Sequence, residues 1–198
     1  LQLDDRQVIN RADPSQAISL AEVAQGIEHM GKSRKVLGVF DPSPDFPEET
    51  RPRYTPHFAT GAHLAEVLVD LQTGRVEVTR FVAVHDVGRV INRPGAEGQV
   101  EGSILMGIGS ALYEEYIPDL TNGFVNYILP MVNEMPQMET ILVEVPGFAG
   151  PFGAKGLGET AMLASTPAVI NAVSRAIGTR IREIPATPER VMIAMNNS

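Results

Sequence analysis

The sequence predicts an α+β fold, a mixed sheet with packed helices, and three observations support this class. Apolar and polar residues alternate on both sides of residues 73–74, which is typical of two strands that share one buried face. Helices are predicted over residues 96–115, 159–177 and 188–195. Strands and helices do not alternate regularly, as they would around a parallel α/β sheet, and no repeat of fixed period occurs.

The first 56 residues are predicted to form an N-terminal arm or linker with one short helix. Ser19 precedes Glu22 by three residues, ahead of periodic apolar positions, and this pattern is a capping box at a helix start. The helix should end near Gly31. Prolines recur among charged residues over 41–56, which excludes a helix or a central strand there. A folded domain is therefore expected over residues 57–198.

A β-hairpin is predicted to open this domain. The residues expected on its buried face are Val67, Val69, Leu71, Val76, Val78, Val82 and Val84. A tight turn at Thr73-Gly74 joins the two strands, and Asp86-Val87-Gly88 should end the second one. A further strand is predicted at residues 141–145, followed by a loop at 146–158.

The predicted helix at residues 96–115 contains an unusual amount of glycine. Each glycine inside a helix costs about 1 kcal/mol relative to alanine. We therefore expect the close approach of some other group to compensate for this cost.

The composition fits a globular protein and excludes several functions. Of the 198 residues, 43% are hydrophobic and 20% are charged, and the formal net charge is −8. An acidic chain is a poor partner for nucleic acid or for an anionic membrane. The absence of cysteine excludes disulfides, a cysteine nucleophile, thiolate-bound zinc and a self-contained iron–sulfur cluster.

The sequence also supports expectations about the location of the protein and about where its chain begins. Neither a secretory signal nor a spanning segment is recognisable, so a cytoplasmic location is the default. The chain starts with Leu1 instead of methionine, which suggests a piece of a longer polypeptide. Its true start is then expected upstream of residue 1.

The most informative motif is the glycine-rich loop at residues 150–158. Its glycines can take positive φ, so successive N–H groups can point into one concavity that suits an anion or a polar cofactor. The loop is not a Walker motif, because Lys155 is followed by glycine and no Gly-Lys-Ser/Thr occurs. Glu159 has two interpretations, an acid that complements the helix dipole or a general base.

Two other glycine motifs lie in the helix predicted at residues 96–115. Gly107-Ile108-Gly109 begins like a dinucleotide fingerprint, but the third glycine and a preceding strand are missing, so nicotinamide or flavin binding is not predicted. Gly98, Gln99 and Gly102 combine an approachable backbone with an amide that both donates and accepts hydrogen bonds. Tight helix packing would explain these glycines equally well.

The histidines and serines do not predict a metal site or a hydrolase. The histidines are His29, His57, His63 and His85. They share no metal-ligand spacing, so each is expected at the surface or satisfied in the core. Ser165 and Ser174 lie in a predicted helix without a nearby base, so hydrolase chemistry is not expected.

Several segments of the sequence, including the glycine motifs above, follow one another in an order that is typical of a known family. They are residues 61–67 with Asp70, 73–74, 86–88, 91–92, 98–102, 107–109, 111–112, 127–130, 153–159 and 184–191. In this order they resemble the C-terminal part of the molybdopterin-binding subunit of the xanthine dehydrogenase/aldehyde oxidase family, the molybdenum hydroxylases. The resemblance covers about residues 57–195, and Gly-x-Lys-Gly-x-Gly-Glu at 153–159 is its most specific motif. Ser103 departs from it, because a second glycine is usual there.

The resemblance implies that residues 57–198 are the C-terminal portion of a molybdenum cofactor-binding domain, with Glu159 as the active-site glutamate beside molybdenum. Such a carboxylate accepts a proton while the oxygen nucleophile attacks an electron-poor carbon. The implied contacts to the molybdenum–pterin cofactor, in its simple or dinucleotide form, are Gly98, Gln99, Gly102, Gly153, Ala154, Lys155, Gly156, Leu157 and Gly158. No residue is implied as a metal ligand. Lys155 is expected either near a phosphate or in a surface ion pair.

The resemblance also implies a complex that oxidises a small-molecule substrate, a xanthine-like N-heterocycle or an aldehyde, with water as the oxygen source. Electrons leave through iron–sulfur clusters, which need thiolates that this chain lacks. The expected partners are therefore the upstream half of the molybdenum subunit, which holds the residues that meet the oxo group and shape the substrate pocket, and iron–sulfur and FAD-binding subunits. The isolated chain should be inactive.

Two alternatives stay open from the sequence alone. One is a non-catalytic assembly or binding module that retains the fold without the chemistry. The other is a nucleotide-binding domain that uses the glycine loop as an anion cradle. Bound molybdenum would favour the enzyme over both.

Overall fold

The computed structural model describes residues 1–32, 35, 37–39 and 58–197. It divides into two compact units, residues 1–41 and residues 42–198. Strands and helices occur in both, which confirms the predicted α+β class. The proline-rich segment at residues 41–56 lies outside the described residues. Within the described part, no helix is long and apolar enough to cross a bilayer.

The first unit is a small antiparallel sheet followed by the predicted helix. Its elements are β1 (Gln2–Asp4), β2 (Gln7–Asn10), β3 (Asp13–Ser19) and α1 (Leu20–His29), with the strands in the order β1-β2-β3. The predicted capping box is confirmed. Ser19 Oγ accepts a hydrogen bond from Glu22 N at 3.2 Å, and the Glu22 carboxylate accepts one from Ser19 N at 3.0 Å. The helix ends before Gly31, as expected, where φ is 64°.

The sheet of this unit goes beyond the predicted arm with one helix. Asp4 pairs with Gln7, so Asp5 and Arg6 alone make the turn, with φ values of 37° and 61°. Two-residue hairpin turns with positive φ normally use Asn-Gly, Asp-Gly or Gly-Gly. Because an aspartate and an arginine stand here instead, the sequence carries no recognisable hairpin signal.

The second unit is built on a mixed three-stranded sheet, as predicted. β4 (Gly61–Val69) and β5 (Val76–Asp86) are antiparallel, which confirms the hairpin and its end at Asp86. β6 (Gln137–Val143) pairs with β5 in parallel, and the order is β4-β5-β6. The strand predicted at residues 141–145 therefore begins earlier and ends earlier.

A β-bulge interrupts the hairpin. Glu66 pairs with Arg80 and Val67 with Val78, so Thr79 is an extra residue in β5 without a partner in β4. Side chains alternate with a period of two along a strand. One extra residue therefore moves every later side chain to the opposite face of the sheet.

The bulge corrects the predicted buried face. The buried side chains of β5 are Val76, Val78, Phe81, Ala83 and His85. Val82 and Val84 lie on the other, only half-buried face, because they follow the extra residue. Leu71, also predicted inside, lies in the turn and is 63% exposed.

α2 (Arg93–Leu112) begins and ends slightly earlier than predicted. Asn92 caps its start, because Asn92 Oδ1 accepts a hydrogen bond from Gly95 N at 3.1 Å. Pro94 lies in the first turn, where its missing N–H costs no helical hydrogen bond. The segment predicted as a loop at residues 92–95 is thus the capped start of the helix.

The helix predicted over residues 159–177 is interrupted at Ala164. Its two parts are α3 (Thr160–Leu163) and α4 (Ser165–Ile177). Ser165 Oγ donates a hydrogen bond to Ala161 O at 3.1 Å. A serine hydroxyl that bonds the carbonyl four residues earlier often bends a helix, which explains the break.

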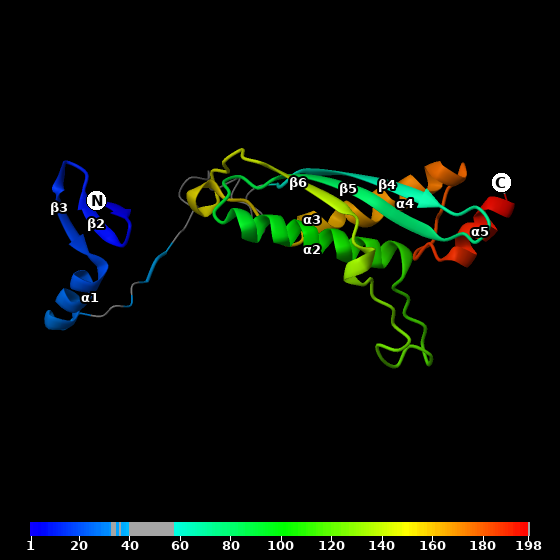
Figure 1. Cartoon of the computed structure of the whole chain (residues 1–198), viewed down its shortest axis with the longest axis horizontal. Coiled ribbons are helices and arrows are strands. Elements are labelled where there is room, and N and C mark those ends of the chain that lie inside the picture. The colour runs from blue at the N-terminus through cyan, green and yellow to red at the C-terminus, as the bar shows by residue number, and fades with distance from the viewer. Residues whose placement is uncertain (33–34, 36, 40–57, 198) are drawn as a thin grey trace, which may run out of the picture. The chain divides into compact units, whose positions relative to one another are not determined.

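The core of the second unit lies between the sheet and the helices α2 and α4, which run along one of its faces (Figure 1). Its largest fully buried apolar side chains are Phe81, Val100, Ile104, Ile108, Val169, Val173 and Val191. The other face of the sheet exposes apolar side chains. These are Leu64, Leu68, Ile141 and Val143. Two single 3₁₀ turns, η3 (Val132–Glu134) and η4 (Pro151–Gly153), lie in the loops.

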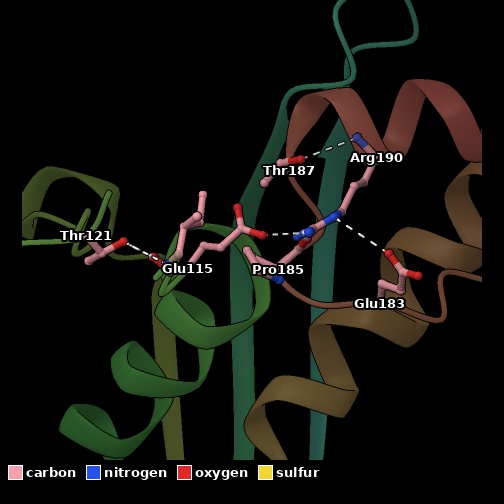
Figure 2. A network of polar contacts seen from close by, with 7 residues as sticks. Glu115, Thr121, Glu183, Pro185, Thr187 and Arg190 are labelled. Carbon is pink, nitrogen blue, oxygen red and sulfur yellow. Dashed lines mark hydrogen bonds and ion pairs between the residues drawn. The ribbon is translucent and has the colours of Figure 1, made fainter. Parts of the chain in front are cut away.

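α5 (Pro188–Asn196) confirms the last predicted helix, and Arg190 ties it to the segment after α2 (Figure 2). Arg190 Nη2 pairs with Glu115 Oε1 at 2.6 Å, and Arg190 Nη1 donates to Pro185 O at 2.9 Å. Arg190 N also donates to the capping Thr187 Oγ1 at 3.3 Å. One arginine therefore joins three chain segments at this end of the unit.

Candidate functional site

The exposed side of α2 carries three of the predicted cofactor contacts. Gly98, Gln99 and Gly102 are exposed, whereas Val100 and Ser103 face the core. An added Cβ at Gly98 or Gly102 would meet no atom of the described chain within 4 Å. Tight packing within this chain therefore does not explain these two glycines.

The glycine loop is fixed to the turn that follows β5. Gly153 O accepts hydrogen bonds from Arg89 N at 3.1 Å and from Gly147 N at 2.9 Å, and Lys155 N donates to Val87 O at 2.9 Å. At Gly88, with φ 67°, an added Cβ would overlap the carbonyl oxygen of Gly153. Glycine is therefore required at this contact, because two backbone segments touch there.

An ion pair with little exposure holds the same two segments together. Lys155 Nζ lies 2.5 Å from Asp86 Oδ2, and only 11% and 13% of the two side chains are exposed. Burial acts to raise the pKa of Asp86, but the hydrogen bonds from Lys155 and from Gly88 N outweigh it and leave the pKa below its usual value. Of the two roles expected for Lys155, pairing is the one seen, with a partner below the surface.

The loop and α2 meet at the start of α3. Gln99 Nε2 donates to Gly158 O at 3.4 Å. Gly156 and Gly158 are exposed, and an added Cβ at either would meet no described atom within 4 Å. Glu159 follows at the surface, and its carboxylate makes no capping hydrogen bond to α3.

Six of the predicted site residues are thus exposed on two segments that the hydrogen bond from Gln99 to Gly158 O links, and this set is here called the glycine platform. They are Gly98, Gln99, Gly102, Gly156, Gly158 and Glu159. The other predicted contacts turn inward. Gly153 and Lys155 anchor the loop, Ala154 O lies against Gly150, and Leu157 packs on the core.

The structure corrects the prediction that Ser165 lacks a base. His63 Nδ1 lies 3.2 Å from Ser165 Oγ, and His63 Nε2 lies 2.7 Å from His85 Nε2. Ser165 is fully buried, so no substrate can reach its hydroxyl and hydrolase chemistry stays excluded. Burial first, and then the neighbouring His85, lower the pKa of His63 to about 4. Burial also lowers the pKa of His85, so both rings are neutral near pH 7.

Among the described residues, His29 and Ser174 take no part in the site. His29 is exposed, as expected, and His57 lies outside the described residues. Ser174 Oγ accepts a hydrogen bond from Ile181 N at 3.0 Å. In the described ranges, no cluster of three or more histidine or acidic side chains could hold a metal ion.

Two contacts between side chains, Lys155 with Asp86 and His63 with His85, could not be predicted from the sequence pattern. The sequence predicts Asp86 only as the end of a strand and as part of the family motif at residues 86–88, whereas in the structure it is the partner of Lys155. His63 and His85 meet because Gly61 pairs with His85, which puts the two histidines diagonally across β4 and β5 on one face. The register of the hairpin would have revealed this contact, but the bulge at Thr79 hides that register.

Comparison with known proteins identifies the family of this fold and surface. The sequence matches the family described as a molybdopterin cofactor-binding domain over residues 1–136. It is 34% identical over 185 residues to the nicotine 6-hydroxylase large subunit of Paenarthrobacter nicotinovorans, covering 89% of this chain and 22% of that one. This chain belongs to the molybdopterin cofactor-binding family. The resemblance to the xanthine dehydrogenase/aldehyde oxidase group is thereby confirmed.

Two further members agree with this assignment. A putative xanthine dehydrogenase molybdenum-binding subunit of Escherichia coli is 37% identical over 139 residues, covering 67% of this chain and 18% of that one. The crystal structure of quinoline 2-oxidoreductase from Pseudomonas putida 86 aligns with 98% of this chain and 25% of that chain, at 30% identity and a TM-score of 0.73. The chain thus spans about a fifth of the length of these curated relatives.

The glycine platform fits a molybdenum–pterin cofactor. A pterin is flat and carries amide-like edges, and Gln99 offers both a donor and an acceptor to such a group. The uncovered backbone at Gly98, Gly102, Gly156 and Gly158 allows a flat or phosphorylated group to come close without meeting a side chain. These are the residues of this chain that could hold the family's cofactor.

Proposed function

We propose that this chain completes the catalytic centre of a molybdenum hydroxylase that acts on a xanthine-like N-heterocycle or an aldehyde. A substrate C–H group and water give C–OH, two protons and two electrons. The observation that carries the proposal is the glycine platform, where an exposed carboxylate stands beside backbone that nothing in the described chain covers.

Glu159 is proposed as the general base. A helix-dipole role explains it poorly, because α3 has only four residues and the carboxylate makes no capping bond. The carboxylate lies at the surface, where it can accept a proton as water's oxygen becomes the nucleophile. The hydrogen bond from Gln99 to Gly158 O fixes the residue directly before Glu159, and so limits where the base can move.

The cofactor would lie over the platform, with Gln99 and the glycine backbone as its contacts. When bound, it supplies the two-electron redox chemistry that no side chain of this protein can provide. Lys155 contributes indirectly, because its ion pair with Asp86 holds the glycine loop in place.

The electrons would leave through another polypeptide. The 198 residues contain no cysteine, so iron–sulfur clusters, and FAD where it takes part, belong to partner subunits or domains. The absence of an electron route makes the isolated chain inactive in this proposal. A cytoplasmic location remains a prediction.

The upstream half of the molybdenum subunit is the proposed principal partner. The segment after α2 projects from the second unit (Figure 1). Several of its apolar side chains are exposed. They include Tyr116, Leu120, Phe124, Val125, Met131 and Val132, of which Phe124 is 86% and Val125 94% exposed. Apolar patches of this kind are rare on self-sufficient monomers and mark surfaces that another polypeptide covers.

The test is co-expression of this chain with the upstream part of the subunit, followed by measurement of bound molybdenum and of substrate hydroxylation. Glu159→Gln should keep the metal and lose turnover about 10²–10⁴-fold, which is the usual contribution of a general base. Glu189→Gln is the matched control, because Glu189, like Glu159, is an exposed acid at the start of a helix. Equal turnover in the two variants would remove Glu159 from the mechanism.

The same preparation separates the alternatives. Tight binding to the upstream part without any metal would favour a non-catalytic assembly module. Thermal stabilisation by ATP or NAD, independent of molybdopterin, would favour a nucleotide-binding domain instead. Stoichiometric molybdenum with a turnover that depends on Glu159 is the result expected here.

A further inference from the structure

We propose that His63, His85 and Ser165 form a directional chain of hydrogen bonds that positions Glu159 through α3. The chain of hydrogen bonds is inferred from geometry alone, whereas its effect on turnover rests on the proposed function. In this proposal Glu159 is the catalytic residue, and His63, His85 and Ser165 are positioning residues.

The three side chains are packed into the core and lie in contact. His85 and Ser165 are buried, and His63 is half-buried between them. The distances are 2.7 Å from His85 Nε2 to His63 Nε2 and 3.2 Å from His63 Nδ1 to Ser165 Oγ. The ring of Phe81 meets the His63 ring edge-on, with centroids 5.3 Å apart, and this contact holds the imidazole in place.

The available protons determine the direction of the chain. Ser165 Oγ donates its single proton to Ala161 O at 3.1 Å, so toward His63 it can only accept. His63 must then carry its proton on Nδ1 and offer a lone pair at Nε2. Because two lone pairs cannot bond, His85 must carry its proton on Nε2 and donate it to His63.

This assignment also accounts for the one buried nitrogen without a partner. Within the described residues, His85 Nδ1 is buried and makes no hydrogen bond. In the assigned tautomer, Nδ1 is an unprotonated acceptor. The reverse direction would leave a buried N–H donor instead, and orphaned buried donors are rarer in proteins than under-satisfied acceptors.

The chain of hydrogen bonds ends on α3, the short helix that begins directly after Glu159. Ser165 is confined on the opposite side by α2, because Gly107 approaches its Cβ so closely that no side chain fits there. The hydroxyl therefore acts at a fixed point, and its bond to Ala161 O sets the direction of α3. Met162 N donates to Glu159 O at 3.1 Å, so the orientation of α3 passes to the backbone of Glu159.

The tautomers can be read from the ¹⁵N chemical shifts of the imidazole nitrogens in the cofactor-free chain near pH 7. We expect the Nδ1–H form for His63 and the Nε2–H form for His85. An Nε2–H form of His63, or rapid averaging of both tautomers, would overturn the directional chain.

The positioning role is tested by amide hydrogen exchange in Ser165→Ala. This variant keeps the Cβ that packs on Gly107 and removes the hydroxyl, with its hydrogen bonds to Ala161 O and His63 Nδ1. Exchange at Met162 N should become about tenfold faster, as expected for the loss of one buried hydrogen bond. Thr166→Val is the matched control. It removes the hydrogen bond from Thr166 Oγ1 to Gly107 O of α2, at 3.0 Å, and leaves the hydrogen bonds among His85, His63 and Ser165 in place.

A merely structural role would make the two variants alike. Equal acceleration at Met162 in Ser165→Ala and Thr166→Val would overturn the proposal, as would no acceleration in either. In the co-expressed enzyme, Ser165→Ala should lower kcat about tenfold with KM and bound molybdenum unchanged. The exchange and NMR results do not depend on turnover, so they stand even if Glu159→Gln proves fully active and the proposed function fails.

Discussion

Glycine serves opposite purposes at two places along α2. On the glycine platform, Gly98 and Gly102 face open space, and no atom of the described chain would meet a Cβ there. Farther along the same helix, Gly107 is in contact with Ser165, and no side chain would fit at this position. In the proposed function, the first pair keeps space for the cofactor, whereas Gly107 allows the chain's own helices to pack. The local sequence is equally glycine-rich at both places, so only the surroundings distinguish them.

The largest effect is expected where the inward part of the glycine loop is anchored. Lys155→Met should lower the free energy of unfolding by about 3 kcal/mol, because the Asp86 carboxylate would stay largely buried without its partner. The measurement is urea denaturation of the isolated chain. Adding Asp86→Asn to the same chain should recover part of the loss. A loss below about 1 kcal/mol would mean that water replaces Lys155 and that the loop is not held by this pair.

Gly107→Val should be the next most damaging change. The new side chain would overlap Ser165, and overpacking of this kind costs about 2 kcal/mol even when neighbours shift. Gly98→Val in the same helix is the control and should change the free energy of unfolding by less than about 0.5 kcal/mol. Similar losses in both variants would contradict the contrast between the open and the closed part of α2.

The outward half of the site could be predicted from the sequence, and the inward half could not. Gln99, Gly158 and Glu159 belong to local motifs, which make them candidates, and the family resemblance supplies the roles predicted for them. The partner of Lys155 is 69 positions away in the sequence, and only the fold brings Asp86 to it. The extra residue Thr79 likewise changes which β5 side chains face the core, and no periodicity announces where a bulge will fall.

A pH dependence should follow from the histidines beside the closed part of α2. In the folded chain the pKa of His63 is lowered from 6.5 to about 4 by burial and by His85, so the unfolded chain binds protons first as the pH falls. The contribution of the neutral His63 to the free energy of unfolding is therefore fully present above pH 6.5 and is lost progressively as the pH falls toward 4. The loss should be about 1–2 kcal/mol, less than the whole shift implies, because the ring is only half-buried and solvent screens its charge.

The control for this dependence is His63→Gln, measured by urea denaturation at several pH values. Carboxylates, including Asp86, titrate in both proteins and cancel in the difference between them. The difference should shrink as the pH falls from 6.5 to 4. A difference that stays constant over this range would show that His63 does not change its charge on unfolding.

The smallest effect on stability, and of opposite sign, is expected on the glycine platform. Gly102→Ala should raise the free energy of unfolding by up to about 1 kcal/mol, because alanine is the better helix former and its Cβ meets nothing in the described chain. In the chain co-expressed with the upstream part of the subunit, the same variant should hold less molybdenum, because the methyl group occupies the space proposed for the cofactor. Gly26→Ala in α1 gives the matched helical gain at a glycine that is not a proposed cofactor contact, and it should leave bound molybdenum unchanged. A Gly102→Ala chain that is stabilised and still binds the metal in full would mean that the open glycines of α2 face empty solvent, and that the cofactor lies elsewhere.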